Sequence, residues 1–246
     1  MAQKETERFT NLAGIYNAGR PGYPPEVADA IFAGMIDPAQ LVVADLGAGT
    51  GASARLLAER GARVIAVEPN KSMRAKAEPV PNVSWIDAPA ERTGLAAASV
   101  DIAVAFQAFH WFDQPAAFSE MLRILRPRGR AAVLFYERDE SDPFTREYGD
   151  IVRTFATDAT EQRRADSLEI FAAFEAWNSV RRTRVTSEQV LDAAGMDDRV
   201  KSTSYFPHAG PESLRLRESV DALFDRHARA GHVRMQLQYL IVTGDL

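Results

Sequence analysis

The stretch Ala44–Gly51, which reads ADLGAGTG, decides the fold of this chain. It overlaps a short apolar run, Leu41–Leu46, whose lack of polar alternation predicts a strand buried on both faces of a parallel sheet. A helix is predicted over Ala52–Gly61, because glycine favours a helix end, and a second buried strand over Val64–Val67. Together the strand, glycine-rich turn, helix and strand predict one β-α-β unit.

The alternation of strands and helices continues along the chain. Pro24 and Pro25 predict the first turn of a helix, and Asp113 and Pro115 predict the start of another. The further predicted strands are Val83–Ile86, Asp101–Phe106 and Ala131–Tyr136. Strands that alternate with helices require right-handed crossovers, so the predicted fold is α/β, with a parallel sheet covered by helices on both faces.

The pattern after Glu137 is less regular. A charged helical stretch extends to about Glu175, and a strand is predicted at Trp177–Val185, with Val200–Phe206 as the alternative. The remaining predicted elements are a helix near Ser187–Ala194, a longer helix near Pro211–Ala230 and a closing strand at Gln236–Thr243. The two late strands would complete the sheet.

Composition excludes several classes of protein. Of the 246 residues, 46% are hydrophobic and 26% are charged, which predicts one folded domain. The 29 Lys and Arg against 34 Asp and Glu give a net charge of −5, which disfavours a nucleic-acid partner. The absence of Cys excludes disulfides, thiolate metal sites and a Cys nucleophile. The polar Met1–Phe9 is unlike a signal peptide and no stretch is apolar enough to span a membrane, so we expect a cytoplasmic protein.

The glycine turn carries an acidic residue that restricts its ligand. Asp45 stands two positions before Gly47, and the spacing is G-x-G-x-G rather than the G-x-G-x-x-G of a dinucleotide site. A carboxylate beside the turn disfavours pyrophosphate and suits a cationic or ammonium group. Glu68 follows the second strand, where a carboxylate can accept from both hydroxyls of a ribose. These features predict a ligand with a ribose and a cationic, phosphate-free tail.

Ala44–Gly51 resembles the first motif of class I S-adenosylmethionine-dependent methyltransferases. Gln107–Asp113 (QAFHWFD) resembles the segment after the fourth strand in a small-molecule branch, methyltransferase type 11, related to trans-aconitate methyltransferases. In that branch a stretch similar to Tyr16–Pro24 folds over the cofactor. The resemblance covers about Phe9 to Tyr136, and is weaker around Ser202–Phe206 and in the final strand. It implies a Rossmann-like, doubly wound, mostly parallel seven-stranded sheet with an antiparallel C-terminal strand and a helical cap insert.

The resemblance implies S-adenosyl-L-methionine as the cofactor. In such enzymes Asp87 would bind the adenine amino group, and Arg20 would either hold the methionine carboxylate with its bidentate fork or remain a surface charge. The cofactor-binding residues expected are Tyr16, Arg20, Asp45, Gly47, Ala48, Gly49, Gly51, Glu68, Pro69, Asp87, Ala88, Phe106 and Gln107.

The candidate acceptor-binding residues are Tyr23, His110, Trp111 and Tyr136. His110 is the only histidine before the cap, and it would act as a general base, orient the acceptor, or simply close an aromatic wall. No metal is expected, because the acidic run that begins at Glu137 has no histidine nearby and is typical of a solvated segment.

Two positions depart from the pattern of the family. Arg128 stands where the usual turn has glycine, and we expect it only to stiffen that turn. Tyr136 and Glu137 stand where many relatives carry Trp and Asn, which leaves the acceptor preference open. The predicted division of the domain is an N-terminal lid (1–36), a cofactor-binding core (37–140), a substrate cap with a late strand (141–235) and a closing strand (236–246).

The predicted function is methyl transfer to an oxygen, or to a nitrogen, of a small-molecule acceptor by in-line displacement. The alternatives are a nicotinamide-dependent oxidoreductase on a similar sheet, which Asp45 disfavours, and a non-catalytic S-adenosylmethionine-binding protein. No Asp-Pro-Pro-Tyr motif follows the fourth strand, which disfavours amino-directed DNA methylation, and the acidic balance disfavours RNA. Neither nucleic acid nor membrane is an expected partner. The protein would be a monomer or a homodimer.

Overall fold

The computed structural model of the chain describes residues 19–246, which fold around one seven-stranded sheet. The strand order is β3-β2-β1-β4-β5-β7-β6. Strands β1 to β5 are parallel, and β7 runs antiparallel to both of its neighbours. The predicted fold, a doubly wound, mostly parallel sheet with an antiparallel C-terminal strand, is confirmed.

All the strands predicted before Glu137 are present. They are β1 (Val42–Leu46), β2 (Arg63–Val67), β3 (Val83–Ile86), β4 (Val100–Phe106) and β5 (Leu125–Arg138). Strand β5 begins earlier than predicted because the turn before Arg130 forms a bulge inside it: Val100 pairs with Leu125, but Ile102 pairs with Arg130. Arg128 lies in this bulge with a φ of +66°, a left-handed conformation that glycine adopts without strain.

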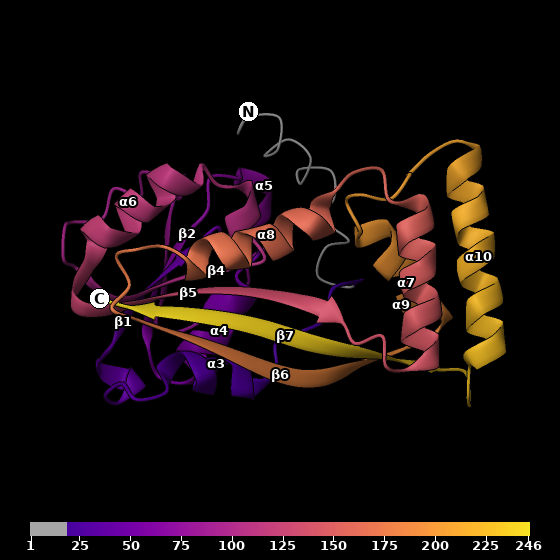
Figure 1. The fold of residues 1–246 in the computed structure, drawn as a ribbon, viewed down its shortest axis with the longest axis horizontal. Helices are drawn as coiled ribbons and strands as arrows, with labels where there is room; N and C mark the ends of the chain where they lie inside the picture. The colour runs from indigo at the N-terminus through magenta and orange to yellow at the C-terminus, as the bar shows by residue number, and fades with distance from the viewer. Residues whose placement is uncertain (1–18) are drawn as a thin grey trace.

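Helices cover both faces of the sheet. They are α3 (Pro25–Phe32), α4 (Ala52–Glu59), α5 (Lys71–Arg74), α6 (Gln114–Ile124) and the short 3₁₀ helices η1 (Pro38–Gln40) and η2 (Phe109–Trp111). Helices α3 and α4 pack on one face, and α6 packs on the other together with α8 (Thr160–Ala172) (Figure 1). Each face therefore has its own apolar core.

The chain after Glu137 agrees with the prediction only in part: the helical stretch, the late strand, the long helix and the closing strand are present, but other elements differ. It forms α7 (Pro143–Phe155), α8, β6 (Ser179–Leu191), α9 (Ala193–Ser202), α10 (Pro211–His227) and β7 (Val233–Asp245). The helix predicted near Ser187–Ala194 is wrong, because Ser187–Leu191 continue β6 and pair with β7. The alternative strand Val200–Phe206 is also wrong, since α9 extends to Ser202. Strand β6 is an edge strand with mostly exposed or half-exposed side chains, so it lacks the apolar run of a central strand.

A long ribbon of β5, β7 and β6 extends past the short central strands. Helices α7, α9 and α10, which we call the cap helices, stand at its far end, whereas α8 lies along the sheet (Figure 1). The closing strand begins at Val233 instead of Gln236. Tyr16 and half of the predicted lid (1–18 of 1–36) lie outside the described residues, so the division into lid, core and cap stays a prediction.

A buried arginine on β5 ties the end of α3 to the end of β7. Arg130 on β5 is 5% exposed and donates to the carboxylate of Asp245 on β7, with one N–O distance of 3.1 Å. It also donates to the backbone carbonyls of Ile31, at 2.7 Å, and Ala33, at 2.8 Å. Burial of this charge is therefore matched by a counter-ion and two further acceptors.

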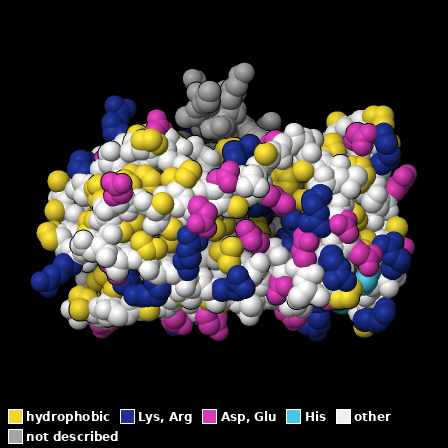
Figure 2. Space-filling view, in the orientation of Figure 1, with side chains coloured by type: hydrophobic (Ala, Val, Ile, Leu, Met, Phe, Trp, Pro, Cys, Tyr) yellow, Lys and Arg dark blue, Asp and Glu magenta, His cyan; other side chains and the backbone are white. Residues whose placement is uncertain are grey.

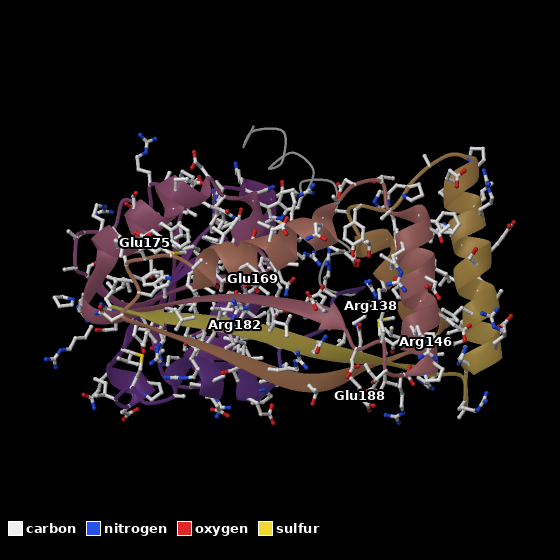
Figure 3. All side chains as sticks on the ribbon, viewed as in Figure 1. Arg138, Arg146, Glu169, Glu175, Arg182 and Glu188 are labelled. Atoms are coloured by element: carbon white, nitrogen blue, oxygen red, sulfur yellow. The ribbon has the colours of Figure 1, made fainter. Side chains whose placement is uncertain are left out.

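We expect Arg130→Ala to lower the free energy of unfolding by about 3–5 kcal/mol, because it leaves a partly buried carboxylate and two carbonyls without their donor. Arg182→Ala is the matched control: Arg182 on β6 pairs with Glu169 on α8 at the surface (Figure 3), so its loss should cost about 1 kcal/mol or less. Urea unfolding of both variants checks this. Equal losses in the two variants would contradict the structural role of Arg130.

Candidate active site

The carboxyl ends of the central parallel strands bring the candidate residues to one edge of the sheet. The glycine turn follows β1, Glu68 follows β2 and Gln107 follows β4. Strand β1 lies between β2 and β4, so the turn lies between the other two segments. From β1 the chain continues to β2 on one side of β1, and from β3 it returns to β4 on the other side of β1. Open α/β sheets bind ligands at such a point, where the strand order reverses.

Only glycine fits at the first position of the glycine turn. Gly47 has a φ of +70°, and a Cβ there would lie 2.7 Å from the Cβ of Ala108 in the segment after β4. Gly49 has a φ of +58°, and its N–H donates to Oε2 of Glu68 at 2.9 Å. The turn is thus packed against one neighbouring segment and hydrogen-bonded to the other.

Asp45 is fully buried beneath this turn. Its Oδ2 accepts from the hydroxyl of Ser53 at 2.6 Å, whereas Oδ1 has no hydrogen-bond partner among residues 19–246. Burial, with a smaller contribution from the neighbouring Glu68, raises the pKa of Asp45 to about 7, against the lowering effect of hydrogen bonds from Ser53 and from the backbone at Ala54. A buried carboxyl with one unused oxygen fits a cationic group of a ligand.

Glu68 is held rigidly at the end of β2. Its Oε2 accepts from Gly49, and its Oε1 accepts from the backbone N–H of Asn70 at 2.8 Å. Burial raises the pKa of Glu68 above its usual value. Each carboxylate oxygen has a second lone pair, so the fixed carboxylate can still accept from ligand hydroxyls.

Asp87 lies exposed at the end of β3 and is oriented by Arg74 of α5. Nη1 of Arg74 donates to Oδ1 of Asp87 at 2.9 Å, and the same guanidinium donates to the backbone carbonyl of Glu68. Arg74 therefore joins two of the candidate positions, although it is part of no motif in the sequence. Four other residues predicted to bind the cofactor differ in exposure: Ala48 and Phe106 are buried, Ala88 is half-buried and Pro69 is exposed.

Gln107 and His110 carry polar atoms that no described residue satisfies. Gln107 has a φ of +57°, and both atoms of its side-chain amide are buried without a partner in residues 19–246. His110 lies on η2, 8% exposed, and neither ring nitrogen has a partner in the same part of the chain. Backbone strain and unsatisfied buried polar groups cost free energy and collect at functional sites, which makes both residues fit for contact with a ligand.

The surroundings of His110 keep its imidazole neutral. Its ring lies 4.5 Å from Trp111 and 5.2 Å from Phe135, centroid to centroid. Burial lowers the pKa of His110 well below 6.5, and the cations Arg164, Arg163 and Arg20 lower it further. A general base works best when its pKa is near the operating pH, so this environment favours an orienting role.

A cavity of about 320 Å³ lies between the end of β5 and the cap helices. Arg20 and Tyr136 line it together: Nη1 of Arg20 donates to the Tyr136 hydroxyl at 2.8 Å, and Nη2 donates to the carbonyl of Ser202 at 3.0 Å. Burial alone would raise the pKa of Tyr136, but Arg20 and the other nearby guanidinium groups bring it below its usual value. Of the predicted acceptor residues, Tyr136 lines this cavity.

Two other predicted acceptor residues lie beside the cavity rather than in its wall. Tyr23 packs its ring on Phe106 at 5.0 Å and on Tyr239 at 6.1 Å. Trp111 lies under the guanidinium of Arg163, 5.5 Å from its ring centroid. Arg20, predicted as a cofactor residue, is brought to the cavity with Tyr136, whereas Asp45, Glu68 and the glycine turn are not among its lining residues.

Several cavity residues are missing from the predicted site. They are Arg138, Tyr148, Glu161, Arg164, Arg199, Thr203 and Tyr205. All of them follow Glu137, where the chain has no recognisable motif. The one sequence signal was the weak similarity around Ser202–Phe206, which includes Tyr205 and the α9 end.

Two kinds of feature are absent from residues 19–246. The His, Asp and Glu side chains there form no group of three that could hold a metal ion. In the same range no helix combines the length and the apolar character needed to cross a membrane.

Comparisons with known proteins agree with this arrangement. The family model described as a methyltransferase domain matches residues 44–133. An uncharacterized methyltransferase of Mycobacterium tuberculosis is 35% identical over 201 residues, which cover 80% of this chain and 76% of that protein. A solved structure from Anaeromyxobacter dehalogenans, named as a type II methyltransferase, is 25% identical with a TM-score of 0.68, and covers 92% of this chain and 97% of its own.

The fold alone does not determine the chemistry. The [4+2]-cyclase SpnF has a TM-score of 0.54 with this chain at 14% identity, over 98% of this chain and 96% of its own. The arrangement of side chains at the carboxyl edge must therefore carry the functional argument.

The raised pKa of Asp45 predicts a pH-dependent stability. A carboxyl that binds its proton more tightly in the folded than in the unfolded protein contributes less stability as the pH rises, here between about 4 and 7. We therefore expect the stability advantage of the wild type over Asp45→Asn to shrink by about 2–3 kcal/mol from pH 5 to pH 8 without ligand. Urea unfolding at both pH values measures it, with the exposed Asp221→Asn on α10 as control. A pH-independent difference would contradict the burial of an ionisable Asp45.

Proposed function

The chain belongs to the class I S-adenosylmethionine-dependent methyltransferases, and we propose that it methylates an oxygen atom of a small-molecule acceptor, with nitrogen as the second choice. One observation carries the proposal. Buried polar atoms without partners in residues 19–246, on Asp45, Gln107 and His110, lie at the carboxyl ends of the central strands, beside a polar cavity. Such a site fits a charged cofactor on one side and a small polar acceptor on the other.

The residues at the end of β1 and β2 fit the cofactor. Oδ1 of Asp45 has no partner in the described chain and suits the ammonium of the methionine part, because a buried carboxyl gains most from a cation. Glu68, fixed by Gly49 and Asn70, suits the ribose hydroxyls, and Asp87 suits the adenine amino group. S-adenosylmethionine, when bound, supplies a methyl group that is attached to a positively charged sulfur. The sulfur is the leaving group of the displacement and departs as a neutral thioether.

The residues after β4 and β5 would position the acceptor. A displacement at a methyl group needs the attacking atom in line with the leaving sulfur, and correct positioning can contribute several kcal/mol. His110 is neutral near pH 7 and can donate or accept one hydrogen bond at each ring nitrogen, and Gln107 offers an amide. An acceptor carboxylate is already ionised at that pH, so no residue has to remove a proton.

The cap helices would exclude water from the acceptor. The cavity is lined by Tyr136 on β5 and by residues of α7, α8 and α9, and Arg20 bridges β5 to the α9 end. Exclusion of water strengthens the electrostatic contacts inside and protects the transferred group from hydrolysis. Arg20 would then contribute to closure, and its contact with the methionine carboxylate stays a prediction.

The experiment is a measurement of S-adenosylhomocysteine formation with a panel of small carboxylic acids, phenols and amines. We expect turnover with an oxygen acceptor, and a rate that shows no inflection near pH 6.5, because the pKa of His110 lies well below that value. His110→Gln should keep the rate within about tenfold, since glutamine can still orient the acceptor, whereas His110→Ala should lose more.

The proposal fails if no member of the panel is methylated while S-adenosylmethionine binds, which is the result for a non-catalytic binding protein. An inflection near pH 6.5 that disappears in His110→Gln would instead reject the orienting role and make His110 the base. Cofactor affinity, measured on each variant, separates an effect on the acceptor from an effect on cofactor binding.

A further inference from the structure

The interior of the acceptor cavity carries more cations than anions. Five arginines line it, at positions 20, 138, 153, 164 and 199, against three glutamates, at positions 137, 140 and 161. On the outside of the cap end, Lys and Arg side chains lie beside Asp and Glu side chains (Figure 2). The excess of positive charge is thus a property of the cavity and not of the part of the surface that Figure 2 shows.

Two of the five arginines are neutralised by neighbouring glutamates. Arg138, at the end of β5 beside the cap helices (Figure 3), donates to both carboxylate oxygens of Glu161 at 2.7 and 2.9 Å. Tyr205 donates to the same carboxylate at 3.1 Å. Arg153, at the cavity rim, pairs with Glu140 at 2.8 Å. These pairs form a wall whose charges are already balanced.

Arg164 and Arg199 are not balanced in this way. Their side chains belong to residues that are only 8% and 7% exposed, and neither forms a direct ion pair with a carboxylate in residues 19–246, although Arg164 is near enough to Glu161 to help lower its pKa. The Nε of each has no hydrogen-bond partner there, and Arg199 donates from Nη1 to the amide oxygen of Gln189 at 2.7 Å. Each guanidinium lies near an aromatic ring, Arg164 by Tyr205 at 5.9 Å and Arg199 by Tyr148 at 5.8 Å, contacts that orient without neutralising.

A buried arginine stays charged, because its pKa lies far above physiological pH. A buried charge without a counter-ion is strongly destabilising, and proteins retain such groups where a ligand supplies the opposite charge. Guanidinium groups match carboxylate and phosphate oxygens in a planar, bidentate geometry. The cavity therefore has the chemistry of a site for an oxyanion.

We propose that Arg164 and Arg199 form an anion subsite that binds a carboxylate or phosphate group of the methyl acceptor, separate from the atom that is methylated. The proposal rests on the proposed function only in assigning the anion to the acceptor. The cavity volume of about 320 Å³ is at the small end of ligand pockets, so the acceptor is a small polar acid.

The anionic group anchors the acceptor and is not itself methylated, because the arginines lower its reactivity as a nucleophile. A carboxylate that accepts bidentate hydrogen bonds from guanidinium groups donates its electron pairs to them and is a weaker nucleophile. The reacting oxygen must then be a second group, directed from the cavity toward His110, which is close enough to Arg164 for that cation to lower its pKa. The acceptor would thus carry at least two oxygen functions, one held by the arginines and one methylated.

The test measures anion binding directly, without methyl transfer. Succinate, its monomethyl ester, acetate and inorganic phosphate are titrated calorimetrically into the full chain saturated with S-adenosylhomocysteine, at constant ionic strength. We expect succinate or phosphate to bind, and Arg164→Gln and Arg199→Gln each to raise that dissociation constant at least tenfold. Arg153→Gln, which changes an already paired arginine of the same cavity, is the matched control and should change it less than twofold.

Stability separates a ligand site from a structural role. In the absence of anion, Arg164→Gln should be at least as stable to heat as the wild type, because it lacks an unbalanced buried charge. Phosphate or succinate should raise the melting temperature of the wild type only. Arg164→Lys keeps the charge without the fork and should bind with intermediate affinity. Binding of phosphate alone identifies a phosphate handle, and binding of succinate alone a carboxylate handle.

The proposal is overturned if the wild type binds neither anion, or if the two glutamine variants bind as tightly as the wild type. It is also overturned if both variants lose stability without anion while Arg153→Gln does not. A protein that binds anions through these arginines but methylates nothing would refute the proposed function and leave the anion subsite in place.

Discussion

The site depends on the close approach between the glycine turn after β1 and the segment after β4. Gly47 and the Cβ of Ala108 are so near that a side chain at position 47 would lie 2.7 Å from it. This contact fixes Gln107, the next residue toward β4, in a left-handed conformation with its amide unsatisfied by the described chain. Because Gly49 is hydrogen-bonded to Glu68 as well, the same turn sets the spacing of three neighbouring strand ends.

The two sides of the site carry opposite charge. Two buried acids, Asp45 and Glu68, lie at the ends of β1 and β2, and the unbalanced arginines Arg164 and Arg199 lie across the edge in the cap-side cavity. In the proposed reaction the positive sulfonium and a negative acceptor oxygen become a neutral thioether and a neutral methylated oxygen. Such a reaction is favoured in surroundings of low dielectric constant, where separated charges cost more than in water. The cavity between β5 and the cap helices and the neutral His110 fit that requirement.

The sequence was sufficient for the first half of the fold because its central strands are buried on both faces and read as uninterrupted apolar runs. Glu68 could be located at the end of β2 for the same reason, and the glycine spacing located the turn. The second half was harder: β6 is an exposed edge strand, so its last residues resembled a helix. Arg164 and Arg199 could not be predicted, because helices α8 and α9 meet β5 only through tertiary packing, and an arginine on a charged helix looks like a surface residue.

The most direct test of the account is a calorimetric titration of S-adenosylmethionine at pH 6 and pH 8, in two buffers of different ionisation enthalpy. Asp45, with a pKa of about 7, is mostly protonated at pH 6 and must ionise to receive an ammonium group. The account predicts binding with release of close to one proton at pH 6, less at pH 8 and none in Asp45→Asn. Failure to bind, or binding whose heat at pH 6 is the same in both buffers, would contradict it.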